Sequence, residues 1–248
     1  MFRAEMRKLR RSSTWIIAIV LPLLAVVTGT LNLAANADAL DAGWASFTSQ
    51  VVLFYGLLFF SMGISLLAAA VWRAEHRGSN WNLLLTSTVR PVGLATAKVA
   101  AVLVPVALMQ VVLIVGTAAA GTFVLGLDGG FPWQFAVVGV VAIVAAIPLI
   151  ALQSLLSMLM RSFAAPVAIC LLGCVAGVAA VTSPTLRPLG HVIPQAINTR
   201  ALNLGSTAIA GSGGLTLGDT LPLLATGIGG GAVVLLVTAT LLRTVKLR

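Results

Sequence analysis

The chain has 248 residues, of which 59% are hydrophobic and only 8% are charged, and its formal net charge is +9. A soluble domain carries roughly 25% charged residues, so this composition excludes a water-soluble globular protein and indicates that lipid surrounds the chain. The basic residues lie at the ends of apolar runs and form no groove or stripe, so we expect no nucleic-acid partner.

A short basic segment precedes the first apolar run. Residues 1–13 place Phe2, Met6 and Leu9 at helical spacing among five basic residues. This pattern predicts an amphipathic helix that lies on the inner leaflet of the membrane. The alternative is a segment that acts only as a signal for membrane orientation.

Six apolar stretches are each long enough to cross a bilayer, which takes about 20 residues. None of them contains a charged residue or a histidine. The sequence therefore predicts an all-α integral membrane protein with six transmembrane helices in one domain over residues 1–248. The expected spans are 15–35, 49–72, 99–120, one within 131–160, one within 163–182, and 222–242.

The charges predict how these spans are oriented. With the N-terminus inside, 13 of the 15 lysines and arginines fall on the cytoplasmic side, and only Arg187 and Arg200 fall outside. Cytoplasmic segments of membrane proteins carry an excess of basic residues, so both termini are expected in the cytoplasm. Lys98, just before the third span, is expected to snorkel to the inner membrane boundary.

Two connecting segments are longer than a turn requires. Residues 73–98 are expected to form a cytoplasmic loop in which Trp81, Leu84 and Leu85 share one helix face. That face is suited to docking a partner protein, and the alternative is packing onto the membrane surface. For residues 184–221 the sequence predicts an extracellular or partly re-entrant element. It contains a short helix over 195–204, and we expect no seventh span there.

The chain carries no sequence motif for catalysis, metal binding or nucleotide binding. A P-loop, a zinc-binding HExxH and a GxSxG nucleophile turn are all absent, so we expect no catalytic or metal site and no enzymatic activity. Four polar side chains do lie within spans, where they serve interhelical hydrogen bonds or line a substrate path: Ser61, Ser65, Gln110 and Gln153. Gly173 and Gly177 allow close approach of another helix.

Two motifs resemble the entry helix and the coupling region of ABC type-2 exporter permeases. The first is Glu-x-x-Lys-Leu-Arg-Arg-Ser over 5–12, followed by Trp15 and a span. The second is Glu-x-Arg-Gly-x-x-Trp-Asn-x-Leu-Leu over 75–85, followed by Arg90-Pro91 and Lys98. Within that family the chain looks most like the lantibiotic-immunity-type permeases, which are bacterial subunits that export antimicrobial peptides.

The resemblance implies a cellular location, partner subunits and the residues that contact them. It implies a multi-pass protein of the bacterial inner membrane that pairs with a second permease subunit, as a homodimer or with a related chain, near Gly173 and Gly177. It implies separate cytoplasmic ABC ATPase subunits that hold ATP and magnesium, while this chain binds no cofactor. The residues expected to couple to the ATPase are Glu75, Arg77, Gly78, Trp81, Leu84 and Leu85.

The expected function is the membrane-spanning part of an ATP-driven exporter. The absence of charges at depth favours an amphipathic or apolar substrate taken from the membrane, such as an antimicrobial peptide or a drug. Two alternatives stay open. One is an ABC permease for lipid or polysaccharide export, and the other is a membrane scaffold or sensor subunit that transports nothing.

Overall fold

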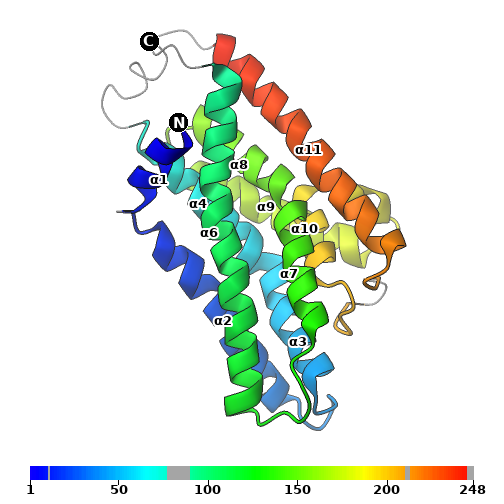
Figure 1. The fold of residues 1–248 in the computed structure, drawn as a ribbon. Coiled ribbons are helices and arrows are strands. Elements are labelled where there is room, and N and C mark those ends of the chain that lie inside the picture. Colours follow the sequence, from blue (N-terminus) through cyan, green and yellow to red (C-terminus); the bar gives the residue numbers. More distant parts are fainter. Residues whose placement is uncertain (11, 77–89, 210–212, 245–248) are drawn as a thin grey trace.

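The protein is described by a computed structural model that covers residues 1–10, 12–76, 90–209 and 213–244 (Figure 1). Within these ranges the chain is helical and contains no strand. A short helix, α1 (Phe2–Arg10), precedes six helical segments that are long and apolar enough to cross a membrane. This confirms the predicted all-α fold with six spans.

Three of the six spans are single α-helices or nearly so, and three contain an irregular turn or break. In chain order the elements are α2 (Thr14–Ala35); α3 (Trp44–Phe54), the π-helical η1 (Tyr55–Phe59) and α4 (Phe60–Arg73); α6 (Pro91–Ala119) with the π-helical η2 (Ala120–Val124); α7 (Trp133–Ala145) and α8 (Ile147–Leu159); α9 (Ala164–Thr182); and α11 (Leu217–Thr244).

Several boundaries differ from the sequence prediction. The second span begins at Trp44 and not at 49, and the last span begins at Leu217 and not at 222. The third span was expected to begin at 99, but α6 begins at Pro91, so Lys98 lies on the helix and the connection predicted as 73–98 is shorter. Proline suits the first position of a helix because its missing N–H needs no partner there. The fourth span breaks at Ala146, since Pro148 has no N–H to donate to the preceding turn.

The segment before the last span enters the bundle. It contains a 3-10 turn, η3 (Arg187–His191), and the short helix α10 (Pro194–Leu202), which packs between α7 and α9 (Figure 1). Most side chains of α10 are buried. The Thr199 hydroxyl donates to the backbone oxygen of Gly56 in η1 at 2.8 Å. The predicted short helix is therefore present, and it reaches the middle of the second span.

The two ends of the bundle are formed by different elements. Helix α1, the end of α4, the start of α6 and the end of α11 lie at one end, and the starts of α3 and α7 lie at the other (Figure 1). The core is built around Phe47, Tyr55, Phe60 and Trp72 of the second span, all fully buried. Helices α2, α9 and α11 expose apolar faces. In α11, only 17% of an apolar stretch of 18 residues is buried. These faces suit contact with lipid or with another subunit.

Close packing of α11 against the fourth span can be tested at two glycines. A Cβ at Gly227 would lie 2.6 Å from the backbone oxygen of Val144, whereas a Cβ at Gly229 would meet open space. We expect Gly227→Ala to lower the free energy of unfolding by about 1–3 kcal/mol through overpacking. Gly229→Ala should leave it unchanged or raise it slightly, because alanine favours helix more than glycine does.

The measurement is SDS-induced unfolding in mixed micelles, followed by tryptophan fluorescence. Equal behaviour of the two variants would contradict the packing of α11 on α7.

Candidate functional site

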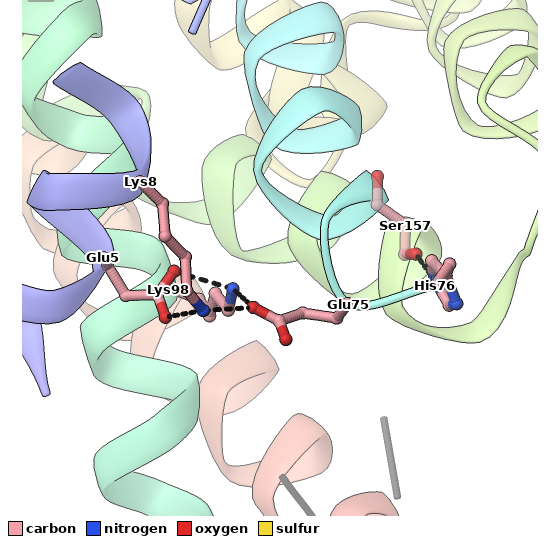
Figure 2. Close-up of polar contacts among 6 residues, drawn as sticks. All are labelled: Glu5, Lys8, Glu75, His76, Lys98 and Ser157. Carbon is pink, nitrogen blue, oxygen red and sulfur yellow. Dashed lines mark hydrogen bonds and ion pairs between the residues drawn. The ribbon is translucent and has the colours of Figure 1, made fainter. Parts of the chain in front are cut away.

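Four charged side chains meet at the end of the bundle that holds α1 (Figure 2). Lys98 Nζ lies 2.7 Å from Glu5 Oε2 and 2.6 Å from Glu75 Oε1. Lys8 Nζ lies 2.9 Å from Glu5 Oε1 and 2.6 Å from Glu75 Oε1. Two ammonium groups and two carboxylates thus alternate in a closed ring, which we call the charged cluster. It joins α1, the turn after α4 and the first turns of α6.

The charged cluster is buried except at one corner. The side chain of Lys98 is fully buried and those of Glu5 and Glu75 nearly so, whereas that of Lys8 is 45% exposed. A buried ammonium group is several kcal/mol unfavourable unless it is paired and hydrogen-bonded. Lys98 Nζ also lies 5.1 Å from the centre of the buried Trp72 ring, which favours a cation. The expectation that Lys98 snorkels was wrong, because two carboxylates hold it inside the bundle.

The pKa values of two members of the charged cluster follow from these contacts. Burial lowers the pKa of Lys8, but hydrogen bonds and charge from Glu75 and Glu5 outweigh it, so the pKa is raised from its ordinary 10.5. Burial raises the pKa of Glu75, but the charges and hydrogen bonds of Lys98 and Lys8 outweigh it, so the pKa is lowered from 4.5. Both groups are therefore charged at neutral pH.

The buried face of α1 was only partly predicted. Glu5 and Leu9, one helical turn apart, are buried against the bundle, while Met6 is half-buried and Phe2 is 43% exposed. The sequence analysis included Glu5 and Lys8 in the entry-helix motif over 5–12, but it did not predict that they meet Glu75 and Lys98. A signal was available, since Glu5 and Glu75 are the only glutamates in the chain and the only acids on the side predicted to be cytoplasmic.

The turn that carries Glu75 is also held from its other side. His76 Nε2 lies 2.8 Å from the backbone oxygen of Ser157 at the end of α8, where an N–H at that position donates (Figure 2). The turn after α4 is therefore fixed to α6 through Glu75 and to α8 through His76. It lies directly before the undescribed part of the connection to α6.

A cleft of about 390 Å³ opens beside the charged cluster. Lys8, Arg73 and Ser12 contribute its polar wall, and Ile17 and Phe163 contribute its apolar wall. The Arg73 guanidinium lies 5.6 Å from the centre of the Phe163 ring. Cations beside apolar walls are typical of the boundary between lipid headgroups and acyl chains.

Most of the predicted coupling residues lie outside the described part of the chain. These are Arg77, Gly78, Trp81, Leu84 and Leu85, whose role stays a prediction. Glu75 is described, and its carboxylate is engaged by the two lysines of the charged cluster. Contact of Glu75 with an ATPase likewise stays a prediction.

The four polar side chains predicted at depth are all buried, each at most 1% exposed. The Ser65 hydroxyl donates to Gln153 Oε1 at 2.9 Å and so joins α4 to α8. The Ser61 hydroxyl and the Gln110 amide have no hydrogen-bond partner within the described residues. The Ser65 hydroxyl also lies 3.4 Å from the backbone oxygen of Pro166 in α9, so Ser65 makes interhelical hydrogen bonds, and a substrate path along these residues stays a prediction.

Gly173 and Gly177 lie against α10 of the same chain. A Cβ at Gly173 would clash with the Gln195 amide, and one at Gly177 would lie 3.0 Å from the backbone nitrogen of Ala196. The close approach predicted for these glycines therefore serves α10. Their place near a subunit interface stays a prediction.

No group of three or more His, Cys, Asp or Glu side chains that could hold a metal ion is found in the described ranges. The charged cluster pairs each carboxylate with an ammonium group. Its geometry therefore suits the holding of three segments in fixed relation.

Lys98→Met tests whether the charged cluster stabilises the fold. The change leaves two nearly buried carboxylates with one half-exposed partner, so we expect the free energy of unfolding to fall by about 3–5 kcal/mol. Arg7→Met, which removes one exposed charge from α1, should change it by less than about 0.5 kcal/mol. SDS-induced unfolding of both variants gives the comparison, and a stable Lys98→Met protein would show that the ion pairs contribute little.

The attachment of α1 should depend on pH. Glu75 has a lowered pKa, so its contribution is present above pH 4.5 and is lost as the pH falls through the lowered value. Lys8 has a raised pKa, so its contribution is present below pH 10.5 and is lost as the pH rises through the raised value. A nitroxide on exposed Ala4→Cys, with Cys170 and Cys174 replaced, should be immobile at pH 7.

The label should become more mobile as the pH falls below 4.5 through the lowered pKa of Glu75, which its electron paramagnetic resonance spectrum measures. Glu75→Gln should make the label mobile already at pH 7. If Glu75→Gln and the wild type gave the same spectrum at pH 7, the charged cluster would not be what holds α1.

Comparison with known proteins assigns the chain to a family. The sequence profile of the family described as "ABC-2 family transporter protein" matches residues 1–177, which include the whole charged cluster and the spans up to most of α9. No curated protein of similar sequence was found. Because the match covers well over half of the chain, we conclude that the protein belongs to the ABC-2 family of transporter proteins, as a membrane component distinct from the ATPase.

Proposed function

We propose that this chain is the permease subunit of an ATP-driven exporter and that an ABC ATPase acts on it through the connection between α4 and α6. Membership of the ABC-2 family implies ATPase partners in general. The observation that carries the proposal is the charged cluster. It links both flanks of that connection to each other and to α1.

The charged cluster gives a route for force. Glu75 lies at the start of the connection, and Lys98 lies two turns into α6. A load on the connection acts on both flanks. To separate them would leave Lys98 buried without its partners, which costs about 3–5 kcal/mol. We therefore expect α1, the end of α4 and the start of α6 to move together when the ATPase closes on ATP.

The ATPase contacts are assigned to the residues that follow Glu75. Trp81, Leu84 and Leu85 supply the apolar side of this contact, and Arg77 and Gly78 precede them in the connection. Glu75 itself is buried, so in this proposal it positions the connection instead of touching the ATPase. The basic, exposed side of α1 lies next to the same end of the bundle.

The orientation that we propose for the chain rests on its charges. The excess of Lys and Arg at the end holding α1 supports a cytoplasmic location for both termini in a bacterial inner membrane. The middle of every span is free of charged side chains. That supports an amphipathic or apolar substrate, such as an antimicrobial peptide of the kind that lantibiotic-immunity-type permeases export.

A second permease subunit is part of the proposal. Helix α9 turns its glycines toward α10 and exposes Leu171, Leu172 and Val175 on its other side. Helix α2 exposes a similar row that includes Ile16, Val20 and Leu23. These two faces are where we place the partner, as a second copy or a related chain.

The pull-down of an ATPase tests the proposal. The tagged chain is solubilised from its host in a mild detergent, and the eluate is assayed for ATP hydrolysis and analysed by mass spectrometry. We expect an ABC ATPase with the wild type and at least a tenfold loss with Trp81→Ala. Trp133→Ala removes an indole that is 66% exposed at the opposite end of the bundle and should retain the ATPase.

An eluate without ATPase in several mild detergents would reject the exporter and favour a scaffold or sensor. If Trp81→Ala retained the ATPase, the assignment of the docking residues would be wrong, and the exporter proposal would stand.

A further inference from the structure

A cavity of about 460 Å³ lies at the opposite end of the bundle from the charged cluster. Its walls come from the first turns of the second span, the first turns of the fourth span, and residues 202–206 with Leu215 of the segment before the last span. Pockets for small ligands have volumes of roughly 300–1,000 Å³. The size therefore suits a small molecule or one end of a larger one.

The lining of this cavity is selective in its chemistry. None of the 14 lining residues in the described part of the chain is charged. Val52, Phe135, Val138 and Leu202 form a buried apolar floor. A charged group placed there would lose its water without gaining a counter-ion, which is strongly unfavourable. The cavity therefore favours a neutral, apolar group.

Polar groups stand at the edge of the same cavity. Gln134 is exposed, Thr48 and Ser206 are half-buried, and all three line it. The exposed Gln134 amide can bind a hydroxyl or carbonyl group of a ligand whose apolar part fills the floor. The Thr48 hydroxyl donates to the backbone oxygen of Trp44 at 2.7 Å, and Ser206 Oγ accepts from the Ala208 N–H at 3.1 Å. The combination therefore suits a neutral amphipathic compound.

The cavity is held in shape by contacts between segments distant in the sequence. The backbone N–H of Thr207 donates to the Ser49 hydroxyl oxygen at 2.9 Å and fixes the 202–206 wall to the second span. The rings of Trp44 and Phe131 meet edge to face at 5.5 Å, and Phe131 meets Phe135 in the same way at 5.8 Å. These contacts support a preformed site.

We propose that this cavity binds the transported compound on the release side, with a neutral apolar group in the floor and a hydroxyl or carbonyl group at the Gln134 edge. This inference rests on the proposed function, because it takes the end opposite α1 as the outer side. The compound class is neutral and amphipathic.

Photolabelling of the full-length protein in lipid nanodiscs tests the site. The probe is a diazirine analogue of octanol, and its comparator is the matching analogue of octanoate. Labelled peptides are mapped by mass spectrometry. We expect saturable octanol labelling in 44–52, 132–138 or 202–206, and at least fivefold less labelling by the octanoate analogue.

Two variants of matched chemistry sharpen the result. Ala45→Trp adds an indole at an exposed lining position and should reduce this labelling at least fivefold. Val137→Trp adds the same indole on the exposed side of α7, outside the lining, and should keep labelling within twofold of the wild type.

Labelling that rises linearly with the probe, or that ignores Ala45→Trp, would mean that lipid chains fill the cavity and would overturn the inference. An equal loss in both variants would also overturn it. ATPase recovery in the pull-down is an independent readout. Failed labelling with a co-purifying ATPase rejects this site alone, and saturable labelling without an ATPase rejects the exporter while leaving a binding site.

Discussion

The position of Lys98 constrains the half of the structure that holds α1. Its ammonium group is fully buried, and a low-dielectric interior demands that such a charge be paired. One carboxylate would neutralise it, but both Glu5 and Glu75 approach. Lys8 then balances the second carboxylate, so the charged cluster is neutral overall. Because its members come from three segments, neutrality is reached only when α1, the turn after α4 and α6 are all in place.

The two ends of the bundle are held by interactions of different strength. At the end with α1, ion pairs of 2.6–2.9 Å join the segments. At the other end, neutral hydrogen bonds such as that between Thr207 and Ser49 do so, and each is worth about 1 kcal/mol. In the exporter proposed above, we therefore expect the end with α1 to move as a unit.

Hydropathy was enough to predict the spans, and local pattern was enough to predict the short helix α10. The charged cluster required more, because Glu5 and Lys98 are 93 residues apart and no local period links them. The apolar row of Phe2, Met6 and Leu9 pointed to a membrane-facing helix, whereas the face that is buried begins with Glu5. Periodicity shows that a helix has two faces, but it does not show which neighbour covers each. Residues 77–89 lie outside the described part of the chain, so the coupling role predicted for residues within that range stays a prediction.

The irregular turn η1 and the short helix α10 stabilise each other. Backbone polar groups inside a bilayer must find partners within the protein, so a π-helical turn and a short entering helix are both unfavourable in isolation. Here the Thr199 hydroxyl of α10 donates to the Gly56 oxygen of η1, and Gly173 and Gly177 of α9 leave room for α10 to approach. π-helical turns recur at functional sites because they depart from regular helix at a defined point. A shift of α10 would break this contact and move Leu202, which lines the cavity. The second span extends from that contact to Trp72, beneath Lys98. One continuous element, the second span, thus connects the charged cluster to the cavity wall.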